Sequence, residues 1–181
     1  MSVALAEHFG KRFVTSEQLK NVDELDPVQS FVMAMNQEAK RLGMDSTTYT
    51  NPHGLSEKDH LSTAADLAKL AFTALGNPMF SDYVSTRERG VVVRGSSGYE
   101  RNVIWKNTNQ LLAIQGYEGI KTGTTSKAGA CLASVCFRED RRLLLVVLGS
   151  SSSSSRYTDS RNLYRWAWLN LMGVNDEMGD H

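Results

Sequence analysis

The stretch Gly119-Ile120-Lys121-Thr122-Gly123-Thr124-Thr125-Ser126-Lys127-Ala128-Gly129 opens the most strand-like part of the chain. Two apolar runs follow it, at residues 130–137 and 142–149, and the four polar residues between them favour a hairpin turn. Residues 119–150 therefore predict three consecutive antiparallel strands, with a Lys-Thr-Gly tripeptide on the first of them.

Side-chain alternation assigns each residue of the tripeptide to a face of that strand. Lys121 and Gly123 should share one face and Thr122 should lie on the other, although twist or a bulge near Gly123 would bring the Thr122 hydroxyl to the rim. A lysine beside glycines on one strand is suited to line an anion-binding active site.

The rest of the chain predicts mainly helices joined by polar loops. Pro27 should begin a helix that Gly43 ends, and Thr63 with Asp66 resembles a capping box at the start of another. The expected helices are residues 2–9, 27–42, 63–75, 79–84 and 157–172, with strands at 87–94 and 99–104 and a helical turn at 107–113. The serine run at 150–155 is interpreted as a flexible connection from strand to helix.

Composition sets bounds on the function. The 181 residues carry 20 Lys and Arg against 20 Asp and Glu, a balance that gives no argument for a nucleic-acid partner. The longest apolar runs are far shorter than the roughly 20 residues that a membrane-spanning helix needs. Cys131 and Cys136 lie at odd separation on one predicted strand and so face opposite sides, which argues against a disulfide between them.

Two histidines raise the question of a metal site. His53 and His60 lie seven residues apart in a loop, with Asp59 and Asp66 nearby in the sequence. The group lacks the dense ligand spacing of zinc sites, so a structural role is the favoured interpretation. No metal and no other cofactor is expected.

Several segments in the same order resemble one known family. Lys121-Thr122-Gly123 is similar to the third motif of the serine D-alanyl-D-alanine carboxypeptidases, the low-molecular-weight penicillin-binding proteins of the serine β-lactamase-like superfamily. The matching segments before it are residues 31–44, 47–55, 60–68 and 107–112, and residues 149–166 fit the family pattern after it. Together they cover roughly 160 residues.

The resemblance implies an α/β fold of the α+β type, with an antiparallel sheet flanked by helices. It further implies a single but incomplete domain over residues 1–181, mostly helical to residue 85 and then a sheet with a closing helix. The strands that open the family fold, and the helix that carries its nucleophile, would be missing. Apolar faces should then be exposed, so we expect marginal stability, self-association through an exposed sheet edge, or a complementing polypeptide.

The resemblance also implies roles for four site residues. Lys121 would place positive charge beside the nucleophile and the substrate carboxylate, and Thr122 would hydrogen-bond that carboxylate. Gly123 would leave room for a peptide along the strand, and the backbone N–H of Thr124 would contribute to the oxyanion hole. The implied substrate is a peptidoglycan stem peptide ending in D-Ala-D-Ala.

The nucleophile motifs of the family are absent from this sequence. No serine is followed by lysine at the third position, and Ser153-Ser154-Ser155-Arg156 comes nearest, with an arginine that stays protonated and cannot accept a proton. Ser160-Arg161-Asn162 and Tyr49-Thr50-Asn51 fit the second motif by letter, but both lie in the wrong part of the chain.

We therefore expect the chain alone to be inactive, and to react with β-lactams only if the missing motifs are supplied. The alternative is a non-catalytic module that binds peptidoglycan peptides. Family members act on the periplasmic or cell-wall side of the membrane, whereas residues 1–11 do not resemble an export signal. The chain exactly as written would accordingly stay in the cytoplasm.

Overall fold

The computed structural model describes residues 2–13 and 26–171. These residues form two compact units, which we call the first unit (Met1–Leu70 with Thr125–Ala128) and the second unit (Ala71–Thr124 with Gly129–His181). The described helices of the first unit and the helices and antiparallel strands of the second confirm the predicted α+β class. The last residue of the predicted closing helix, Met172, lies outside the described residues.

The first unit contains α1 (Ser2–Phe9), the 3₁₀ helix η1 (Gly10–Phe13) and α2 (Pro27–Arg41). The predicted start of α2 is confirmed, and the helix ends one residue earlier than predicted. The Asp26 side chain accepts a hydrogen bond from the Val28 N–H at 3.1 Å, and Pro27 occupies the first turn, where its missing N–H is not needed. At the other end Gly43 adopts a left-handed φ of 68°, which lets the chain leave the helix.

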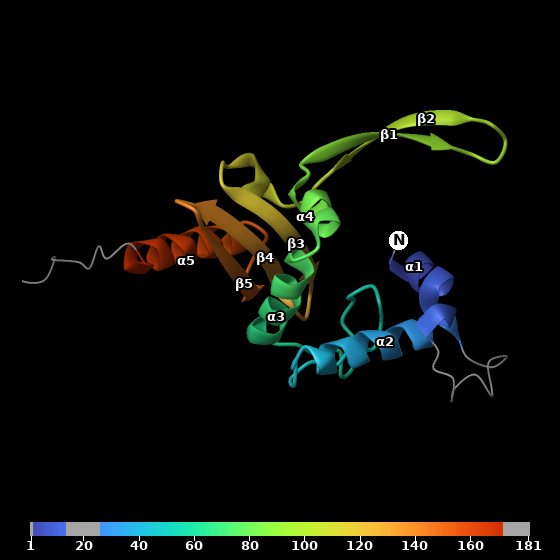
Figure 1. Cartoon of the computed structure of the whole chain (residues 1–181), viewed down its shortest axis with the longest axis horizontal. Helices are drawn as coiled ribbons and strands as arrows, with labels where there is room; N and C mark the ends of the chain where they lie inside the picture. The colour runs from blue at the N-terminus through green and yellow to red at the C-terminus, as the bar shows by residue number, and fades with distance from the viewer. Residues whose placement is uncertain (1, 14–25, 172–181) are drawn as a thin grey trace, which may run out of the picture. The chain divides into compact units, whose positions relative to one another are not determined.

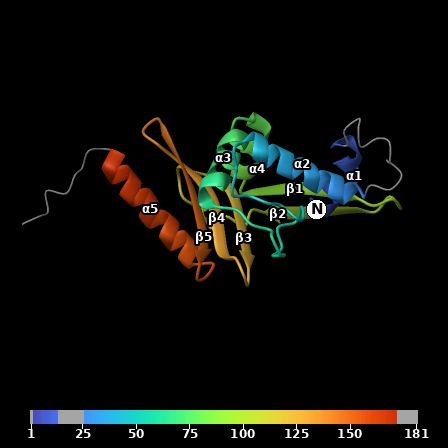
Figure 2. The same ribbon diagram turned by 90° about the horizontal axis from the view of Figure 1, so that it is seen from below.

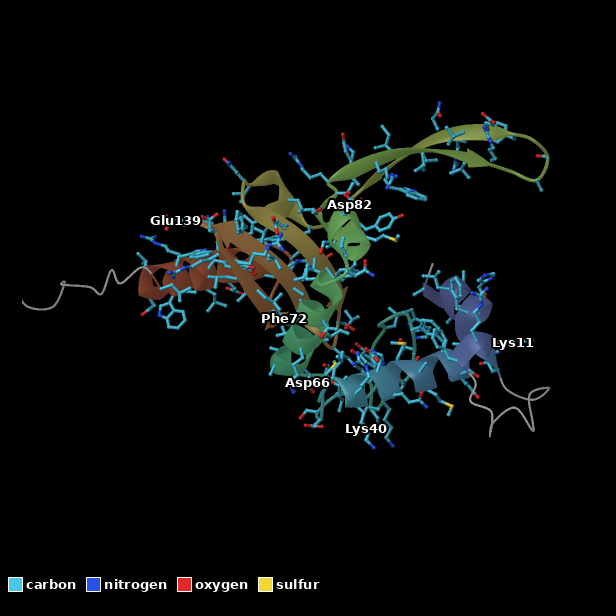
Figure 3. All side chains as sticks on the ribbon, viewed as in Figure 1. Lys11, Lys40, Asp66, Phe72, Asp82 and Glu139 are labelled. Carbon is cyan, nitrogen blue, oxygen red and sulfur yellow. The ribbon has the colours of Figure 1, made fainter. Side chains whose placement is uncertain are left out.

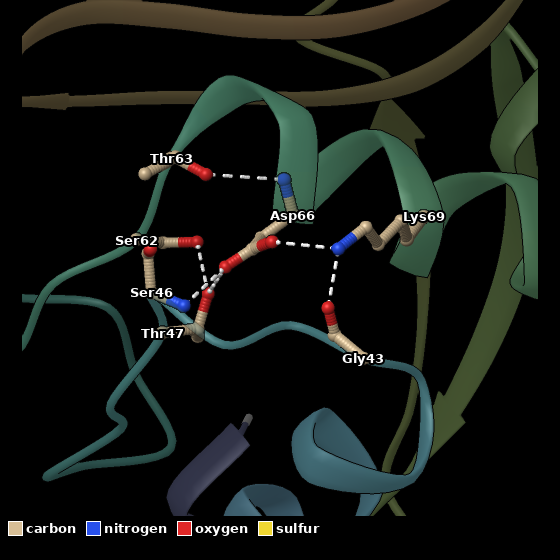
Figure 4. Close-up of polar contacts among 7 residues, drawn as sticks. All are labelled: Gly43, Ser46, Thr47, Ser62, Thr63, Asp66 and Lys69. Atoms are coloured by element: carbon tan, nitrogen blue, oxygen red, sulfur yellow. Dashed lines mark hydrogen bonds and ion pairs between the residues drawn. The ribbon is translucent and has the colours of Figure 1, made fainter.

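Helix α3 (Ala64–Leu75) begins where the capping-box pattern predicts, but its acidic residue has a different partner. Thr63 Oγ1 accepts the Asp66 N–H at 3.2 Å, as a cap should. The Asp66 carboxylate instead accepts hydrogen bonds from Ser46 N and Thr47 Oγ1 at 2.9 and 2.8 Å and pairs with Lys69 at 3.2 Å (Figure 4). The Asp66 side chain thus makes tertiary contacts that fix the loop after α2, where the sequence pattern indicated a local capping contact.

The contact of Asp66 with Ser46, Thr47 and Lys69 makes the stability of the first unit depend on pH. Burial raises the pKa of Asp66, but the hydrogen bonds from Thr47 and Ser46 and the charge of Lys69 outweigh it and hold the pKa below its ordinary 3.8. A lowered pKa means that the contact stabilises the fold above that value and is lost as pH falls through the folded-state pKa. We expect urea unfolding midpoints to decline in acid for the wild type. Asp66→Asn should be less stable near neutral pH and flat in acid, so parallel pH profiles would contradict this account.

The second unit contains a sheet with strand order β3 (Tyr117–Thr125), β4 (Gly129–Arg138) and β5 (Arg141–Ser150). These are the three consecutive strands that the sequence predicted. Glu139 and Asp140 both take positive φ in the two-residue turn between β4 and β5, which are antiparallel. The strand β5 extends to Ser150, so only residues 151–154 connect it to the closing helix α5 (Ser155–Leu171).

Apolar residues on both faces of this sheet are buried. The helix α5 packs on one face, where Leu132 and Cys136 of β4 meet Tyr164 and Trp168. Ala133 and Val135 of β4 point the other way. There they meet residues from the end of α3, from α4 (Pro78–Ser85) and from the neighbouring strands, namely Ala71, Leu75, Phe80, Val84, Ile120 and Leu144. Figure 2 shows the resulting order of α5, sheet and α4.

A second, two-stranded sheet projects from this unit. Its strands β1 (Glu88–Arg94) and β2 (Glu100–Lys106) form an antiparallel hairpin that extends away from the other elements of the second unit (Figure 1). The prediction of this strand pair is confirmed, with β2 ending two residues later than expected. The helical turn predicted at 107–113 is shorter, a 3₁₀ helix η3 over Gln110–Ala113.

Several large apolar side chains are exposed, as the sequence led us to expect. Phe72 on α3 is 75% exposed and stands out from its helix in Figure 3. Trp105 and Trp166 are also exposed, whereas Trp168 of α5 is buried in the core. Cys131 adjoins a bulge between Ala130 and Leu132, and no disulfide joins it to the buried Cys136.

Candidate functional site

The Lys-Thr-Gly tripeptide lies on β3 with the predicted alternation. Lys121 and Gly123 are exposed, whereas Thr122 is only 7% exposed. The Thr122 hydroxyl shares a hydrogen bond with the Thr108 hydroxyl at 2.7 Å, so it is engaged away from the face that presents Lys121. The Lys121 ammonium donates to the backbone carbonyl of Thr122. The structure thus separates the two polar side chains to which the sequence assigned neighbouring roles.

Close backbone packing holds the start of this strand in place. Gly119 has a φ of 107°, and a Cβ atom there would lie 2.7 Å from the Val84 carbonyl oxygen, so only glycine fits. The Asn107 amide donates to the carbonyls of Val84 and Thr86, both at 3.2 Å. The segment before the tripeptide is therefore anchored to the end of α4, which limits movement of Lys121.

A buried arginine supports the exposed end of the tripeptide from behind. Arg156, on the first turn of α5, is 7% exposed. Its Nη1 donates to Gly123 O at 3.2 Å, to Thr124 Oγ1 at 3.0 Å and to Cys131 O at 3.4 Å. Its guanidinium also lies 5.0 Å from the ring centroid of Tyr157, whose hydroxyl donates to Thr108 O. One side chain therefore ties β3, β4 and α5 together.

The charge of Arg156 has no counter-ion in the part of the chain that the structure describes. None of the ion pairs formed there includes it, and its Nε has no hydrogen-bond partner there. A buried cation without a carboxylate partner is costly, and a nearby anion offsets that cost. The strand that bears Lys121 is thus backed by a second positive charge, which favours anion binding on this face.

Sequence reasoning missed this role because it considered Arg156 only as a substitute proton acceptor. The available signal was the arginine at the start of a helix that follows a buried strand.

The two segments whose letters fit the second motif of the family, residues 160–162 and 49–51, have structural roles. Ser160 is fully buried and donates to the Arg156 carbonyl at 2.6 Å, while the Asn51 amide donates to Leu55 O at 3.0 Å. Hydroxyls of the serine run bond to one another, for example Ser152 to Ser155 at 2.7 Å.

The last residue of β3 belongs to the first unit. The Thr125 hydroxyl shares a hydrogen bond with the Ser56 hydroxyl at 2.7 Å and accepts the Ala128 N–H at 3.0 Å. Asn51 shapes the loop before Ser56, because its side-chain oxygen accepts the N–H groups of His53 and Gly54 at 3.2 and 2.8 Å. Asn51 therefore holds the turn at residues 51–54.

The two histidines of the same loop accept hydrogen bonds through their Nδ1 atoms. His53 Nδ1 accepts Leu55 N–H at 3.2 Å, and His60 Nδ1 accepts Thr50 N–H at 3.0 Å. A neutral imidazole with Nδ1 as acceptor carries its proton on Nε2, which leaves no lone pair for a metal. Burial lowers the pKa of His60, with Glu57 opposing the shift. Within residues 2–13 and 26–171, no group of three candidate ligands is close enough to hold a metal ion.

Comparison with known protein families gives a direct match. The sequence model described as D-alanyl-D-alanine carboxypeptidase, peptidase S11, matches residues 27–152. Among curated proteins, D-alanyl-D-alanine carboxypeptidase DacC of Escherichia coli K12 is 33% identical over 77% of this chain and 34% of its own length. DacF of Bacillus subtilis 168 is 33% identical over 71% of this chain and 32% of its own. The chain therefore spans about a third of the length of these relatives.

Solved structures show the same likeness. The DD-transpeptidase of Streptomyces K15 superposes with a TM-score of 0.82 at 29% identity, over 93% of this chain and 62% of that one. The carboxypeptidase DacD of Francisella tularensis matches with a TM-score of 0.74 at 26% identity, over 92% of this chain and 48% of that one. No described helix combines the length and apolar character needed to cross a bilayer.

Proposed function

The chain belongs to the D-alanyl-D-alanine carboxypeptidase family, peptidase S11, and from this premise we propose that it forms the carboxylate-binding wall of such an enzyme's active site. The proposed ligand is a peptidoglycan stem peptide ending in D-Ala-D-Ala, which carries a free carboxylate. Its site of action would be the cell-wall side of the membrane, where the family works.

The observation that carries the proposal is the pairing of an exposed cation with a buried one on either side of the same strand. Lys121 supplies a charge that a ligand can reach, and Arg156 bonds Gly123 and Thr124 from the interior. Charge-assisted hydrogen bonds from such groups are the usual means of holding a carboxylate. Gly123 carries no side chain, so a peptide can lie along the strand there.

The roles of the four motif residues follow from their positions. Lys121 would bind the carboxylate, and the Thr124 N–H would contribute to an oxyanion hole. The Thr122 hydroxyl bonds Thr108, so we propose that it positions the strand, and that direct contact with the ligand would require it to exchange this partner. Hydrolysis also requires an activated serine, and the 181 residues contain no Ser-x-x-Lys.

Two ligands test the proposal together. An N-acylated D-Ala-D-Ala peptide should bind saturably in isothermal titration calorimetry, and the same peptide with a C-terminal carboxamide should bind at least about tenfold more weakly, since it lacks the charge. A fluorescent penicillin should leave no covalent label on this chain after denaturing electrophoresis. Equal affinity for the two peptides would contradict carboxylate recognition, and a stable acyl adduct on any serine would contradict the missing nucleophile.

The alternative function is a non-catalytic module that binds the same peptides. Both functions predict the titration result, and they differ in what happens when a polypeptide with the family's other motifs is added. Adding a polypeptide that carries Ser-x-x-Lys and Ser-x-Asn should restore penicillin labelling if the chain is one part of a catalytic domain. Continued absence of labelling, with peptide binding retained, would favour the binding module.

A further inference from the structure

The hairpin of β1 and β2 is an incomplete sheet. Within the described residues it pairs with no third strand, and its side chains are almost all exposed, including Ile104 at 66%. Figure 3 shows side chains standing out from both strands. An isolated two-stranded hairpin is at best marginally stable in water, and a sheet of three or more strands is needed for independent stability. An unpaired edge is also a template for another strand.

The hydrogen bonds at the two ends of the hairpin show which backbone groups are unused. Asn107 N–H donates to Arg87 O, and Gly95 N–H donates to Tyr99 O, both at 2.8 Å. Antiparallel pairs alternate between hydrogen-bonded and non-bonded positions, so odd-numbered residues of β2 bond β1. The N–H and C=O groups of Glu100, Asn102, Ile104 and Lys106 therefore point outward.

The outer edge of β2 is better suited to pairing than that of β1. Glycine weakens a strand, and Gly90 lies among the residues of β1 whose backbone groups point outward. In β2 every such position carries a side chain that a partner strand can meet.

We propose that this edge binds β2 of a second copy of the chain, antiparallel, about a two-fold axis at Val103. In this register Glu100 pairs with Lys106 of the second copy, and Asn102 pairs with Ile104 of the second copy. Both are even-numbered pairs, so the outward backbone groups meet one another. The odd-numbered pairs bring Arg101 against Trp105 of the second copy and Val103 against its own equivalent, a self-complementary contact suited to a symmetric dimer.

Charge selects this register over its neighbours. Arg94 already pairs with Glu100 across the hairpin at 2.6 Å, and Glu88 faces Lys106. Joining the two edges places these pairs in one row of alternating charge across four strands. The row runs from Arg94 and Glu100 of one copy to Lys106 and Glu88 of the second copy. Sliding the second strand by two residues, with the axis at Asn102, would set Glu100 opposite Ile104 and leave Lys106 unpaired. On the other face the axis carries a row of four valines, two Val91 and two Val103.

A single backbone group tests the proposed edge. The contact is small, so the dimer should be weak and should appear in sedimentation velocity as the concentration rises to several hundred micromolar. Asn102→Pro removes an N–H that β1 does not use and should weaken dimerisation at least about tenfold, while the control Asn102→Thr keeps the donor and should dimerise. A chain that is strictly monomeric throughout, or a dimer that Asn102→Pro leaves unchanged with the hairpin intact, would overturn the proposal.

Charge inversion gives a second test that preserves the hairpin. The variant Glu88→Lys, Arg94→Glu, Glu100→Lys and Lys106→Glu keeps every opposite-charge pair within one chain and within its own dimer. It should form homodimers as well as the wild type does, but in mixtures the glutamate introduced in place of Lys106 would face the wild-type Glu100. Size-tagged copies of the two proteins should therefore fail to form mixed dimers, and free mixing would overturn the proposal.

Discussion

Replacing Arg156 by leucine should both destabilise the second unit and abolish measurable peptide binding. The substitution leaves Gly123 O, Thr124 Oγ1 and Cys131 O without the donor they share. Gly123 and Thr124 are exposed and Cys131 is half-buried, so water can replace part of the lost donor, and removal of an unpaired buried charge offsets more of the cost. An acceptor left without a partner costs about 1–3 kcal/mol when buried, so we expect a net loss at the lower end of that range, about 1–2 kcal/mol. Urea unfolding followed by circular dichroism measures the first effect and peptide titration the second.

Two further variants separate charge from packing at this position. Arg156→Lys keeps the positive charge but lacks the planar fork, so it should recover part of the affinity and little of the stability. Arg165→Leu removes an exposed arginine from the same helix and should change stability by less than about 0.5 kcal/mol. If Arg156→Leu and Arg165→Leu behaved alike, Arg156 would have no part in holding the strand.

Replacing Leu132 by alanine should produce a loss of similar or larger size through a different cause. Leu132 is 1% exposed and lies between the sheet and α5, in contact with the cluster that includes Tyr164 and Trp168. Truncating a buried leucine leaves a cavity and costs about 2–5 kcal/mol. The midpoint of thermal unfolding should fall accordingly.

The matched control for Leu132 is Leu148 on the next strand, which is 40% exposed. Leu148→Ala removes the same atoms from a site that water already reaches, so it should cost less than about 1 kcal/mol. Equal losses at the two positions would show that α5 does not cover the sheet in solution as it does in the structure.

The sequence predicted the strands and helix ends where local chemistry decides them. Alternation placed Lys121 and Thr122 on opposite faces, and Pro27 and Gly43 marked the bounds of α2. Side chains that act over long sequence distances were not predictable in this way. Asp66 looked like a local cap but bonds Thr47, and Arg156 reaches Gly123, 33 residues away. Such pairings depend on the tertiary fold, which a single sequence does not specify residue by residue.

The edge of the hairpin illustrates the same limit. The sequence predicted the two strands of the hairpin, but the backbone groups that remain unused depend on the hairpin register. That register follows from the turn, where Gly98 adopts a φ of 81° and donates its N–H to Gly95 O at 3.0 Å. Only when this register is known can Glu100 and Lys106 be assigned to the outer edge of β2, where each could pair with the other in a second copy.

The central claim is that the strand bearing Lys121 recognises the carboxylate of a D-Ala-D-Ala peptide, and Lys121→Ala tests it most directly. Lys40→Ala serves as the control, because it removes an exposed lysine from α2 in the first unit. Calorimetric titration with the N-acylated peptide should give an affinity about 10- to 100-fold lower for Lys121→Ala and unchanged for Lys40→Ala, as expected for loss of one charge-assisted contact. An affinity for Lys121→Ala equal to that of the wild type would contradict the claim.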